Sequence, residues 1–444
     1  MEVALLAAFW ISLGLLAYTH VAYPGLVAVC GRLASRRLNT QADSSTVADH
    51  GLPSVTVVIP AHNEEAVIGE KLRNTLQSDY PPEKLDVVVV SDGSSDRTVE
   101  IARSLGDSRV TVIQLPQRHG KPAAVNHAVA RAPGEVLCLC DANVMFQPDA
   151  VRRLVRRLED PRVGAASADV CLASDQSDFG QGEKAYYRLE RCVQLGESLI
   201  GSMMGVDGGM YVIRRGLYEP VPDDTIVDDF VISMNVIRQG KRVVYEPRAV
   251  AHENGTPSAA GEFRRRVRLA AGAAQVLKRA HFPPLNRPME LWQFVSHKLL
   301  RWLGPLWLAA LLASSAGLAA WSAGNLVYVL VFAAQLAFYS FALVAAFSTR
   351  FRRTKLGGVP FYFTMSHIGM AWGFVKGLLN LQPATWERTE RGASSRESSR
   401  LTMSIPCADV PCRKRKGVMS NDETPNDEKM PNEDARKGYG ATSI

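Results

Sequence analysis

Long apolar stretches lie near both ends of the chain, and the region between them mixes short apolar runs with charged residues. Residues 3–30 contain no Asp, Glu, Lys or Arg. Residues 302–320 and 326–347 are also uncharged, and each is long enough to cross a hydrocarbon layer of about 30 Å. Only a short turn separates the last two. The pattern therefore predicts an N-terminal spanning helix and a C-terminal helical hairpin.

The N-terminal apolar segment, residues 1–31, has the features of an uncleaved anchor. A cleaved signal peptide begins with basic residues, has a shorter apolar stretch and ends at a small-residue cleavage site. Here no Lys or Arg precedes the segment, whereas Arg32, Arg36 and Arg37 follow it. By the positive-inside rule, we expect the N-terminus outside and the next residues in the cytoplasm. The expected location is the cell inner (plasma) membrane, crossed several times.

The last apolar segment, residues 361–381, leaves two alternatives open. It contains His367 and Lys376, which are costly in lipid. It is either a third spanning helix or a re-entrant or interfacial one, and basic residues after it favour the interfacial alternative. We therefore expect transmembrane and interfacial helices at residues 290–385. Residues 392–444 are polar with little apolar content, which predicts a disordered tail.

Between residues 53 and 285, short apolar runs alternate with helical patterns. Strands are predicted at 54–60, 85–90, 110–115, 135–140, 243–247 and 250–253. Helices are predicted at 64–78, 95–105, 122–130, 149–158, 186–199 and 228–239. This alternation predicts an α/β fold with a parallel sheet covered on both faces. Ligands of such sheets bind at the carboxyl ends of the strands, where Ala61, Asp92 and Asp141 fall.

Charge and cysteine content indicate what surrounds the protein in the cell. The net charge is +7, and arginine clusters border the apolar segments, which indicates contact with anionic lipid headgroups. Nucleic-acid binding is disfavoured because basic and aromatic residues do not interleave. The seven cysteines form neither paired CxxC motifs nor a disulfide framework, so we expect the central domain in the reducing cytoplasm. Cys138 and Cys140 alternate with leucines and are expected to be buried in a strand.

Aspartates recur at four places in the central region: Asp92, Asp141, Asp207 and the pair Asp228–Asp229. Asp92 follows a predicted strand, where a carboxylate can accept a hydrogen bond from a nucleobase imide or a ribose hydroxyl. Gly93 would allow a tight turn beside that ligand. An ordinary strand-to-helix loop with a capping aspartate explains this motif equally well.

Asp141 and Asn143 stand two residues apart, directly after an apolar strand. Oxygen ligands at this spacing suit Mg²⁺ or Mn²⁺ shared with a diphosphate, and the cation offsets the charge of the departing phosphate. Asn is a neutral and weaker ligand, so a polar turn residue is the alternative for Asn143. A dehydrogenase is disfavoured because no GxGxxG motif follows the first strand.

Four motifs occur in order along the central region: IPAHNE (59–64), SDGS (91–94), HGKPAAVN (119–126) and DAN (141–143). With these motifs between apolar segments, the chain resembles the family 2 glycosyltransferases of the GT-A fold. It is most similar to the membrane-embedded branch that includes cellulose, hyaluronan and poly-N-acetylglucosamine synthases. The resemblance covers roughly residues 53–391. It implies a Rossmann-like nucleotide-sugar domain at 53–285 with flanking transmembrane helices.

The resemblance implies roles for residues of these motifs. The counterpart of Asp92 binds uridine, and the segment that contains Lys121 flanks the nucleotide. Asp141 and Asn143 match the metal-binding DxD motif. A surface lysine at the start of a helix is the alternative for Lys121. Substrate contacts are also implied for three residues of the first motif: Pro60, Asn63 and Glu64.

Two later segments resemble the acceptor side of the family's site. Asp207 lies in a glycine-rich stretch similar to an acceptor-side loop, where glycines permit close approach to a sugar chain. A plain turn is the alternative. The segment TIVDDF (225–230) resembles the family's Thr-Glu-Asp motif, which makes Asp229 the general base for the acceptor hydroxyl. Capping of the helix that begins there is the alternative, and Asp228 suits that role.

The last family motifs are altered. Gln-x-x-Arg-Trp corresponds to RRVRL at 265–269, in which Arg265 replaces Gln and Leu269 replaces Trp. Arg268 fits the position that contacts the diphosphate. The missing Trp belongs to the acceptor platform of processive members, so its absence favours single addition over chain elongation. An interfacial helix facing headgroups is the alternative for this segment. Trp386 begins a Trp-x-x-Thr-x-Arg segment that closes over the nucleotide in related synthases.

These features lead to the hypothesis of an inverting membrane hexosyltransferase. It would use UDP-glucose or UDP-N-acetylglucosamine and Mg²⁺ or Mn²⁺ to build an exopolysaccharide or surface glycan. Addition of one sugar to a lipid-linked or short acceptor is an alternative, and a non-catalytic glycan-binding membrane subunit is another. The expected partners are the donor, a glycan or lipid-linked acceptor, membrane lipids and accessory export subunits, but no nucleic acid.

Overall fold

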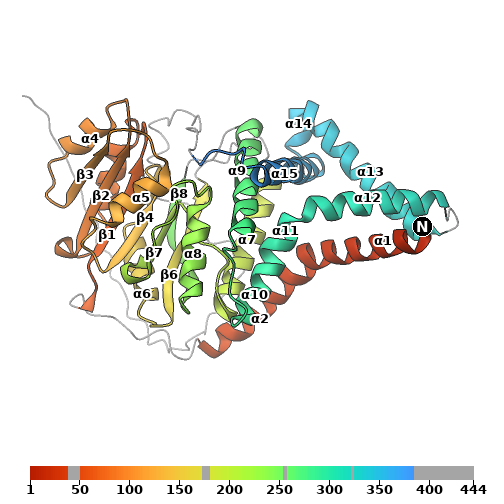
Figure 1. Cartoon of the computed structure of the whole chain (residues 1–444), viewed down its shortest axis with the longest axis horizontal. Coiled ribbons are helices and arrows are strands. Elements are labelled where there is room, and N and C mark those ends of the chain that lie inside the picture. The colour runs from red at the N-terminus through yellow and green to blue at the C-terminus, as the bar shows by residue number, and fades with distance from the viewer. Residues whose placement is uncertain (39–50, 173–180, 254–257, 322–324, 385–444) are drawn as a thin grey trace, which may run out of the picture. The chain divides into compact units, whose positions relative to one another are not determined.

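The computed structural model describes residues 1–38, 51–172, 181–253, 258–321 and 325–384. Trp386 and the tail expected at 392–444 lie outside these described residues. The central part is an eight-stranded sheet with strand order β3-β2-β1-β4-β7-β6-β8-β5 (Figure 1). The strands are β1 (Val55–Ala61), β2 (Leu85–Asp92), β3 (Val110–Leu115), β4 (Val136–Cys140), β5 (Val144–Phe146), β6 (Val163–Leu172), β7 (Met210–Arg214) and β8 (Arg242–Glu253).

Helices follow most of the strands along the chain, as the alternation predicted. They are α3 (Ile68–Leu76), α4 (Thr98–Ser104), α5 (Lys121–Val129), α6 (Ala150–Arg157), α7 (Gln181–Ile200), α8 (Asp228–Arg238) and α9 (Ala259–Lys278). Short 3-10 segments are η3 (Pro82–Lys84) and η4 (Arg215–Leu217). The sequence patterns missed β5, β6 and β7, and they suggested α9 only as an interfacial helix at 265–269. The strand β6 was missed because its sequence, VGAASADVCL, is rich in small residues and shows little periodicity.

The prediction of a parallel sheet holds for part of the sheet only. The strands β3, β2, β1 and β4 are parallel to one another, and β6 is parallel to β8. In contrast, β7 is antiparallel to both β4 and β6, and β5 is antiparallel to β8, so the sheet is mixed. The two strands predicted at 243–247 and 250–253 are one strand, β8, with a register shift near Pro247. Proline lacks an N–H donor and is tolerated at such an irregularity.

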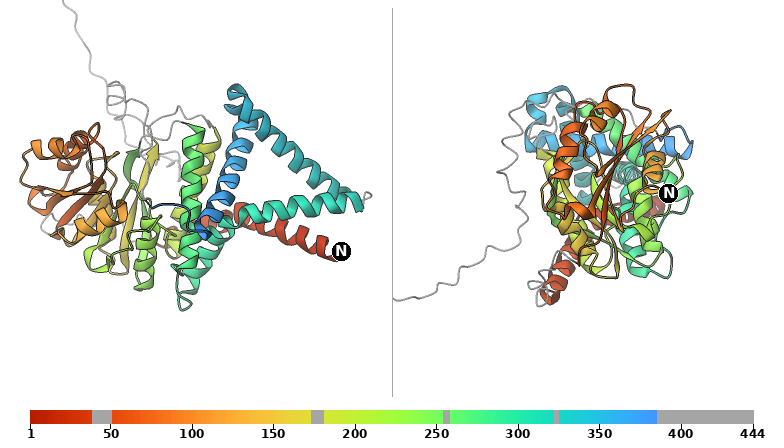
Figure 2. Two further views of the ribbon diagram at one scale, coloured as in Figure 1. Left: turned by 45° about the horizontal axis from the view of Figure 1, so that its top comes forward. Right: turned by 90° about the vertical axis from the view of Figure 1, so that its left-hand side faces the viewer.

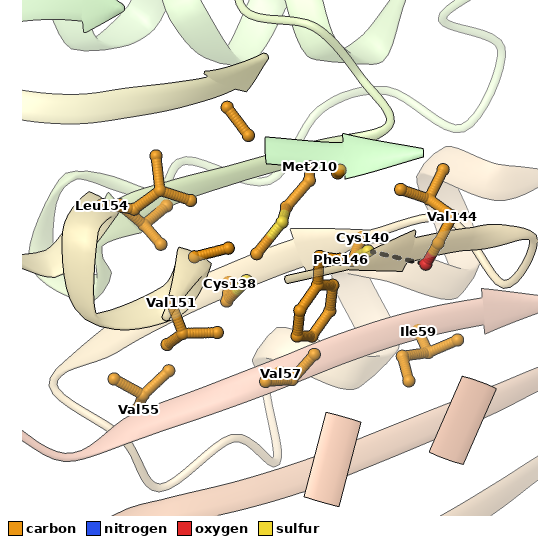
Figure 3. Close-up of a cluster of buried hydrophobic side chains, with 14 of the residues drawn as sticks. Val55, Val57, Ile59, Cys138, Cys140, Val144, Phe146, Val151, Leu154 and Met210 are labelled. Atoms are coloured by element: carbon orange, nitrogen blue, oxygen red, sulfur yellow. Dashed lines mark hydrogen bonds between the residues drawn. The ribbon is translucent and has the colours of Figure 1, made fainter. Parts of the chain in front are cut away.

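Two hydrophobic cores cover the two faces of the sheet, with helices on both sides (Figure 2). Alternate residues of β1 divide between them: Val57 faces the core built with α3 and α6, and Val58 faces the core built with α5 and α8. The same alternation places Cys138 and Cys140 in the first core, which Figure 3 shows in close-up. Both cysteines are free and buried, which confirms the strand interpretation.

The apolar ends of the chain form long helices. The N-terminal helix runs through α1 (Glu2–Ala17), the π-helical η1 (Tyr18–Ala22) and α2 (Tyr23–Leu38). The C-terminal elements are α10 (Pro288–Phe294), the π-helical η5 (Val295–Leu299), α11 (Leu300–Trp302), α12 (Gly304–Trp321), α13 (Leu326–Phe347), α14 (Thr349–Arg352) and α15 (Lys355–Leu378). Within the described chain, three stretches are long and apolar enough to span a membrane: Glu2–Ala34, α12 and α13.

Helix α15 lies along α9, the helix that bears Arg265 and Arg268. Glycines at 369, 373 and 377 form the contact face. A methyl group added at Gly373 would overlap the backbone of Val267, so the two helices touch through their main chains. Small residues allow this close helix packing. The helix α15 is not among the described helices that are long and apolar enough to span a membrane, and its interfacial position stays a prediction.

Candidate active site

Three of the four aspartate positions meet at one edge of the sheet. Asp141 follows β4, Asp207 precedes β7, and Asp229 lies in the first turn of α8. The backbone nitrogen of Asp141 donates to the carbonyl oxygen of Gly209 at 3.1 Å. A methyl group added at Gly208 would lie 2.7 Å from Asp229 Oδ2, so only glycine fits between the loop and that carboxylate. Segments almost ninety residues apart thus share one site.

Lys121 supplies the positive charge of this site. It is the first residue of α5, and its Nζ lies 2.6 Å from Asp141 Oδ1. Burial alone would lower the pKa of Lys121, but attraction to Asp141, Asp228 and Asp229 outweighs it and holds the pKa above its ordinary value. The ammonium group therefore stays charged between carboxylates, where it can also meet a diphosphate.

Asp229 has the environment of a general base. Burial, followed by repulsion from Asp228, raises its pKa above the ordinary aspartate value. Lys121, the backbone N–H of Phe230 and Arg268 act in the opposite direction. A carboxylate with a raised pKa accepts a proton from a hydroxyl more readily than an exposed one does.

Asp207 is a second carboxyl group whose pKa is raised. Burial, followed by repulsion from Glu253 and Asp229, raises its pKa to about 7. The backbone nitrogen of Gly209 donates to Asp207 Oδ1 at 3.0 Å and, with Arg265, limits the shift. Asp207 is therefore poised to change its charge near neutral pH.

The oxygen ligands near Asp141 fit a divalent cation that also binds a diphosphate. The amide nitrogen of Asn143 donates to Glu253 Oε1 at 3.1 Å, so its amide oxygen is the group that would bind a cation. Among the described residues, no group of three or more His, Cys, Asp or Glu side chains could hold a metal alone. Mg²⁺ commonly takes one or two carboxylates and completes its shell with substrate phosphates and water. This donor set matches that pattern.

Comparison with known proteins now identifies the domain. The family model for glycosyl transferase family 2 matches residues 56–219. This segment is a family 2 glycosyltransferase domain. The chain is 25% identical over 241 residues to poly-beta-1,6-N-acetyl-D-glucosamine synthase of Staphylococcus aureus, covering 53% of this chain and 58% of the relative. It is 28% identical over 274 residues to beta-monoglucosyldiacylglycerol synthase of Synechocystis, covering 59% and 53%. The chain therefore spans little more than half the length of these relatives.

A solved structure shows the same architecture. A mannosyltransferase from Pyrobaculum calidifontis, in complex with GDP-Man and Mn²⁺, superposes with a TM-score of 0.62 at 25% identity. The match covers 84% of this chain and all of that one. The mixed sheet with its flanking helices is the GT-A fold, as the motifs predicted.

Asp92 of the family 2 domain is fully buried, and backbone groups hold it. Its Oδ1 accepts from the nitrogen of His119 at 2.7 Å, and its Oδ2 accepts from that of Gly120 at 2.8 Å. A methyl group at Gly93 would lie 2.6 Å from the nitrogen of Arg118, so this glycine permits close approach of the chain itself. Asp92 thus fixes the loop before Lys121, and its contact with a nucleobase stays a prediction.

The residues expected from the first motif hold neighbouring loops together. Pro60 is buried in β1. Asn63, with a positive φ of 55°, accepts from the nitrogen of Ser95 at 2.8 Å through Oδ1. The nitrogen of Glu64 donates to Thr98 Oγ1 at 2.8 Å. These contacts join the loops after β1 and β2, and a role in substrate binding remains a prediction for all three.

The two arginines expected from α9 reach different neighbours. Arg268 donates to the carbonyl oxygen of Ile226 at 3.3 Å, next to the start of α8, and its charge lowers the pKa of Asp229. Arg265 donates to Tyr187 Oη at 2.8 Å, and its charge lowers the pKa of Asp207. Both cations therefore face the acidic cluster. Trp386 cannot be placed, because it lies outside the described residues.

Sequence reasoning missed Lys71 of α3. Its side chain is fully buried, and Nζ donates to the carbonyl oxygen of Val144 at 2.5 Å and to Cys140 Sγ at 2.9 Å. The ammonium group also lies 4.3 Å from the centre of the Phe146 ring. Cys140 and Val144 bracket the Asp141–Asn143 turn (Figure 3), so Lys71 contacts both ends of that turn. A lone lysine on the apolar face of a predicted helix was the signal available.

Proposed function

We propose that this chain is a membrane-anchored inverting glycosyltransferase with a nucleotide-sugar donor. The observation that carries the proposal is the convergence of Lys121, Asp141 and Asp229, with the pKa of Asp229 raised by burial and by Asp228. Glycosyl transfer needs a positively charged group that binds the diphosphate and a base that accepts the proton of the acceptor. Lys121 and Asp229 would supply these two groups at the carboxyl edge of the GT-A sheet.

Each group has a defined task in this proposal. Asp141 and the amide oxygen of Asn143 would hold Mg²⁺ or Mn²⁺, which offsets charge on the nucleotide diphosphate when bound. Lys121 and Arg268 bind the same anionic group and stabilise it as it leaves. Asp229 accepts the proton of the acceptor hydroxyl while the hydroxyl oxygen attacks the anomeric carbon. Direct displacement from the opposite side inverts that carbon.

We propose UDP-glucose or UDP-N-acetylglucosamine as the donor and an exopolysaccharide or surface glycan as the product. The relative from Staphylococcus aureus, a poly-N-acetylglucosamine synthase, supports this choice. The solved mannosyltransferase was bound to GDP-Man, so GDP-mannose belongs in any donor panel. Accessory export subunits are part of the same proposal.

Transfer of one sugar to a lipid-linked acceptor is a second candidate function. Leu269 stands where processive members have a Trp of the acceptor platform, which favours a short product. The relative from Synechocystis is a synthase of a monoglucosyl lipid. Product length separates the candidates, since a ladder of oligomers indicates polymerisation and a single lipid-soluble product indicates one addition.

The deciding experiment uses membranes that contain the full chain. Release of the nucleoside diphosphate is measured with UDP-glucose, UDP-N-acetylglucosamine and GDP-mannose, with Mn²⁺, with Mg²⁺ and with a chelator. We expect release that needs a cation and falls by about 10² or more in Asp229→Asn. The exposed Asp223→Asn is the matched control and should keep full activity. Equal activity in both variants would contradict the assignment of Asp229 as the base, whereas no release by the wild type from any donor would favour the non-catalytic glycan-binding subunit.

A further inference from the structure

The loop between α7 and β7, residues 201–209, is held by side chains that lie outside the catalytic cluster. Gln293 of α10 accepts from the nitrogen of Ser202 at 3.0 Å and donates to the carbonyl oxygen of Glu197 at 3.1 Å. The carboxylate of Glu197 accepts from the nitrogen of Met204 through Oε2 at 3.3 Å. The first half of the loop is therefore fixed by the end of α7 and by α10.

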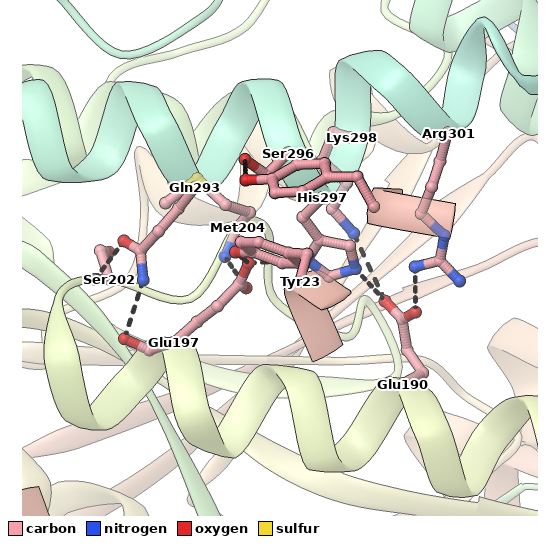
Figure 4. A network of polar contacts seen from close by, with 11 residues as sticks. Tyr23, Glu190, Glu197, Ser202, Met204, Gln293, Ser296, His297, Lys298 and Arg301 are labelled. Atoms are coloured by element: carbon pink, nitrogen blue, oxygen red, sulfur yellow. Dashed lines mark hydrogen bonds and ion pairs between the residues drawn. The ribbon is translucent and has the colours of Figure 1, made fainter. Parts of the chain in front are cut away.

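The carboxylate of Glu197 also joins this loop to the N-terminal membrane helix. Tyr23, the first residue of α2, donates its hydroxyl to Glu197 Oε1 at 2.5 Å. The Nδ1 atom of His297 lies 2.9 Å from the same oxygen (Figure 4). Glu197 and His297 are 0% and 1% exposed, so these contacts are made without water. Loss of any one partner would leave a buried charge poorly compensated.

The charges around His297 are balanced within the network. Its second ring nitrogen, Nε2, lies 3.1 Å from Glu190 Oε1, and Arg301 contacts Glu190 Oε2 at 2.6 Å (Figure 4). The ring of His297 therefore bridges the side chains of Glu197 and Glu190, and Arg301 holds Glu190 from its other oxygen. Such a satisfied buried network holds its members in one geometry.

The far half of the loop reaches the proposed base. The nitrogen of Val206 donates to Ser233 Oγ at 3.1 Å, and the nitrogen of Asp207 donates to Ser167 Oγ at 2.9 Å. Gly208 then fits against the Asp229 carboxylate with no space for a methyl group. A displacement at the Glu197 end of this short loop would therefore move the backbone that touches Asp229.

We infer that Glu197 is a positioning residue for glycosyl transfer and that Tyr23 makes its action depend on the membrane helix. Glu197 holds loop 201–209 against Asp229, and Tyr23 and His297 hold Glu197. The inference rests on the proposed function of the same site. A misplacement of about 1 Å near reacting groups can reduce the rate by ~10². Because Lys121 lies on α5, outside this loop, donor affinity should change much less than the rate.

Two variants and one matched control test the inference in the full chain. Glu197→Gln removes the charge, and Tyr23→Phe removes a single hydroxyl, so the second variant serves if the first does not fold. Tyr18→Phe is the control. The Tyr18 hydroxyl contacts Ser296 Oγ at 2.8 Å and accepts from Trp292 at 3.1 Å, so it joins the same helices without touching the loop.

The first measurement is hydrogen–deuterium exchange of residues 201–209 in lipid nanodiscs. The second is kcat and donor KM for UDP-N-acetylglucosamine in membrane vesicles. Glu197→Gln and Tyr23→Phe should speed exchange of this loop and lower kcat by about tenfold or more, with donor KM changed less than ~twofold. Tyr18→Phe should match the wild type in both.

The outcomes separate the two proposals. Unchanged exchange in Glu197→Gln and Tyr23→Phe, or faster exchange with unchanged kcat, overturns the positioning role. An equal loss in Tyr18→Phe also overturns it, because general docking of the helix would then explain the effect. A wild type that releases no nucleoside diphosphate from any donor contradicts the proposed function, whereas the exchange comparison still shows whether Tyr23 holds the loop.

Discussion

At the residue scale, the chemistry of Asp229 depends on its neighbours more than on its own side chain. An exposed aspartate is a weak base at neutral pH, but burial and Asp228 raise the pKa of Asp229. Lys121 and Arg268 act in the opposite direction and limit the increase in this pKa. Residue identity alone could not have provided this balance, because the four groups come from α5, α8 and α9.

The raised pKa of Asp229 predicts an acid limb in the pH dependence of the rate. The base works only when deprotonated, so kcat should fall as the pH decreases through its raised pKa, above the ordinary value of 3.8. Asp228→Asn removes a repelling charge, which lowers that pKa and moves the limb to lower pH. Rate profiles between pH 4.5 and 8 would show the shift, and an unmoved limb would contradict the assignment of Asp229 as the base.

Lys71 provides a second prediction at this scale. Lys71→Met keeps an unbranched side chain of similar length in the core but removes the donor to Val144 and Cys140. We expect a folded protein in which the Asp141–Asn143 turn is less well held. It should need several-fold more Mn²⁺ for half-maximal release of nucleotide. Arg73→Met, on the exposed side of the same helix, is the control and should not change the Mn²⁺ requirement.

At the element scale, sequence patterns located most helices and strands but not their directions. The apolar runs of β1, β2 and β4 are strong because these strands are buried within the sheet. The pattern failed for β6, whose small residues carry little hydrophobic signal, and for the five-residue β7; it also did not report that β7 is antiparallel to its neighbours. Hydrophobic periodicity reports burial, and burial does not depend on strand direction.

The contact of α15 with α9 yields a prediction for an element. Gly373→Val would force the backbones apart at Val267, close to Arg265 and Arg268. We expect a lower melting temperature and at least a tenfold lower rate, since both arginines would move from the acidic cluster. Gly14→Val makes the same substitution in α1, where the added methyl group meets nothing within 4 Å, and should change neither quantity.

At the scale of the whole molecule, helices from both apolar ends pack against helices of the central domain. The N-terminal helix packs on α12 and on α7, and α15 packs on α9. A buried polar network, with Tyr23, Glu197 and His297, joins α2, α7 and η5. The catalytic domain and its anchor should therefore unfold together.

This arrangement predicts how the chain partitions and faces the membrane. The protein should sediment with membranes and resist extraction at alkaline pH, because three apolar helices hold it. Arginines after the first span predict a cytoplasmic catalytic domain. Protease added to inverted vesicles should cut the family 2 domain, while the same protease should spare it in right-side-out spheroplasts. The opposite result would reverse the predicted orientation.

The sequence by itself determined the α/β class, the apolar ends, the order of the family motifs and most of the candidate residues. Each of these features depends on residues that are close together in the sequence, either through hydrophobic periodicity or through a short motif. Only the tertiary structure decided that Asp141, Asp207 and Asp229 share one site and that the sheet is mixed. It also decided that the carboxylate of Asp92 accepts hydrogen bonds from backbone N–H groups. It also revealed the supports at Lys71 and Glu197. These features depend on contacts between residues far apart in the chain, and such contacts arise only when the core packs and buries their charges together.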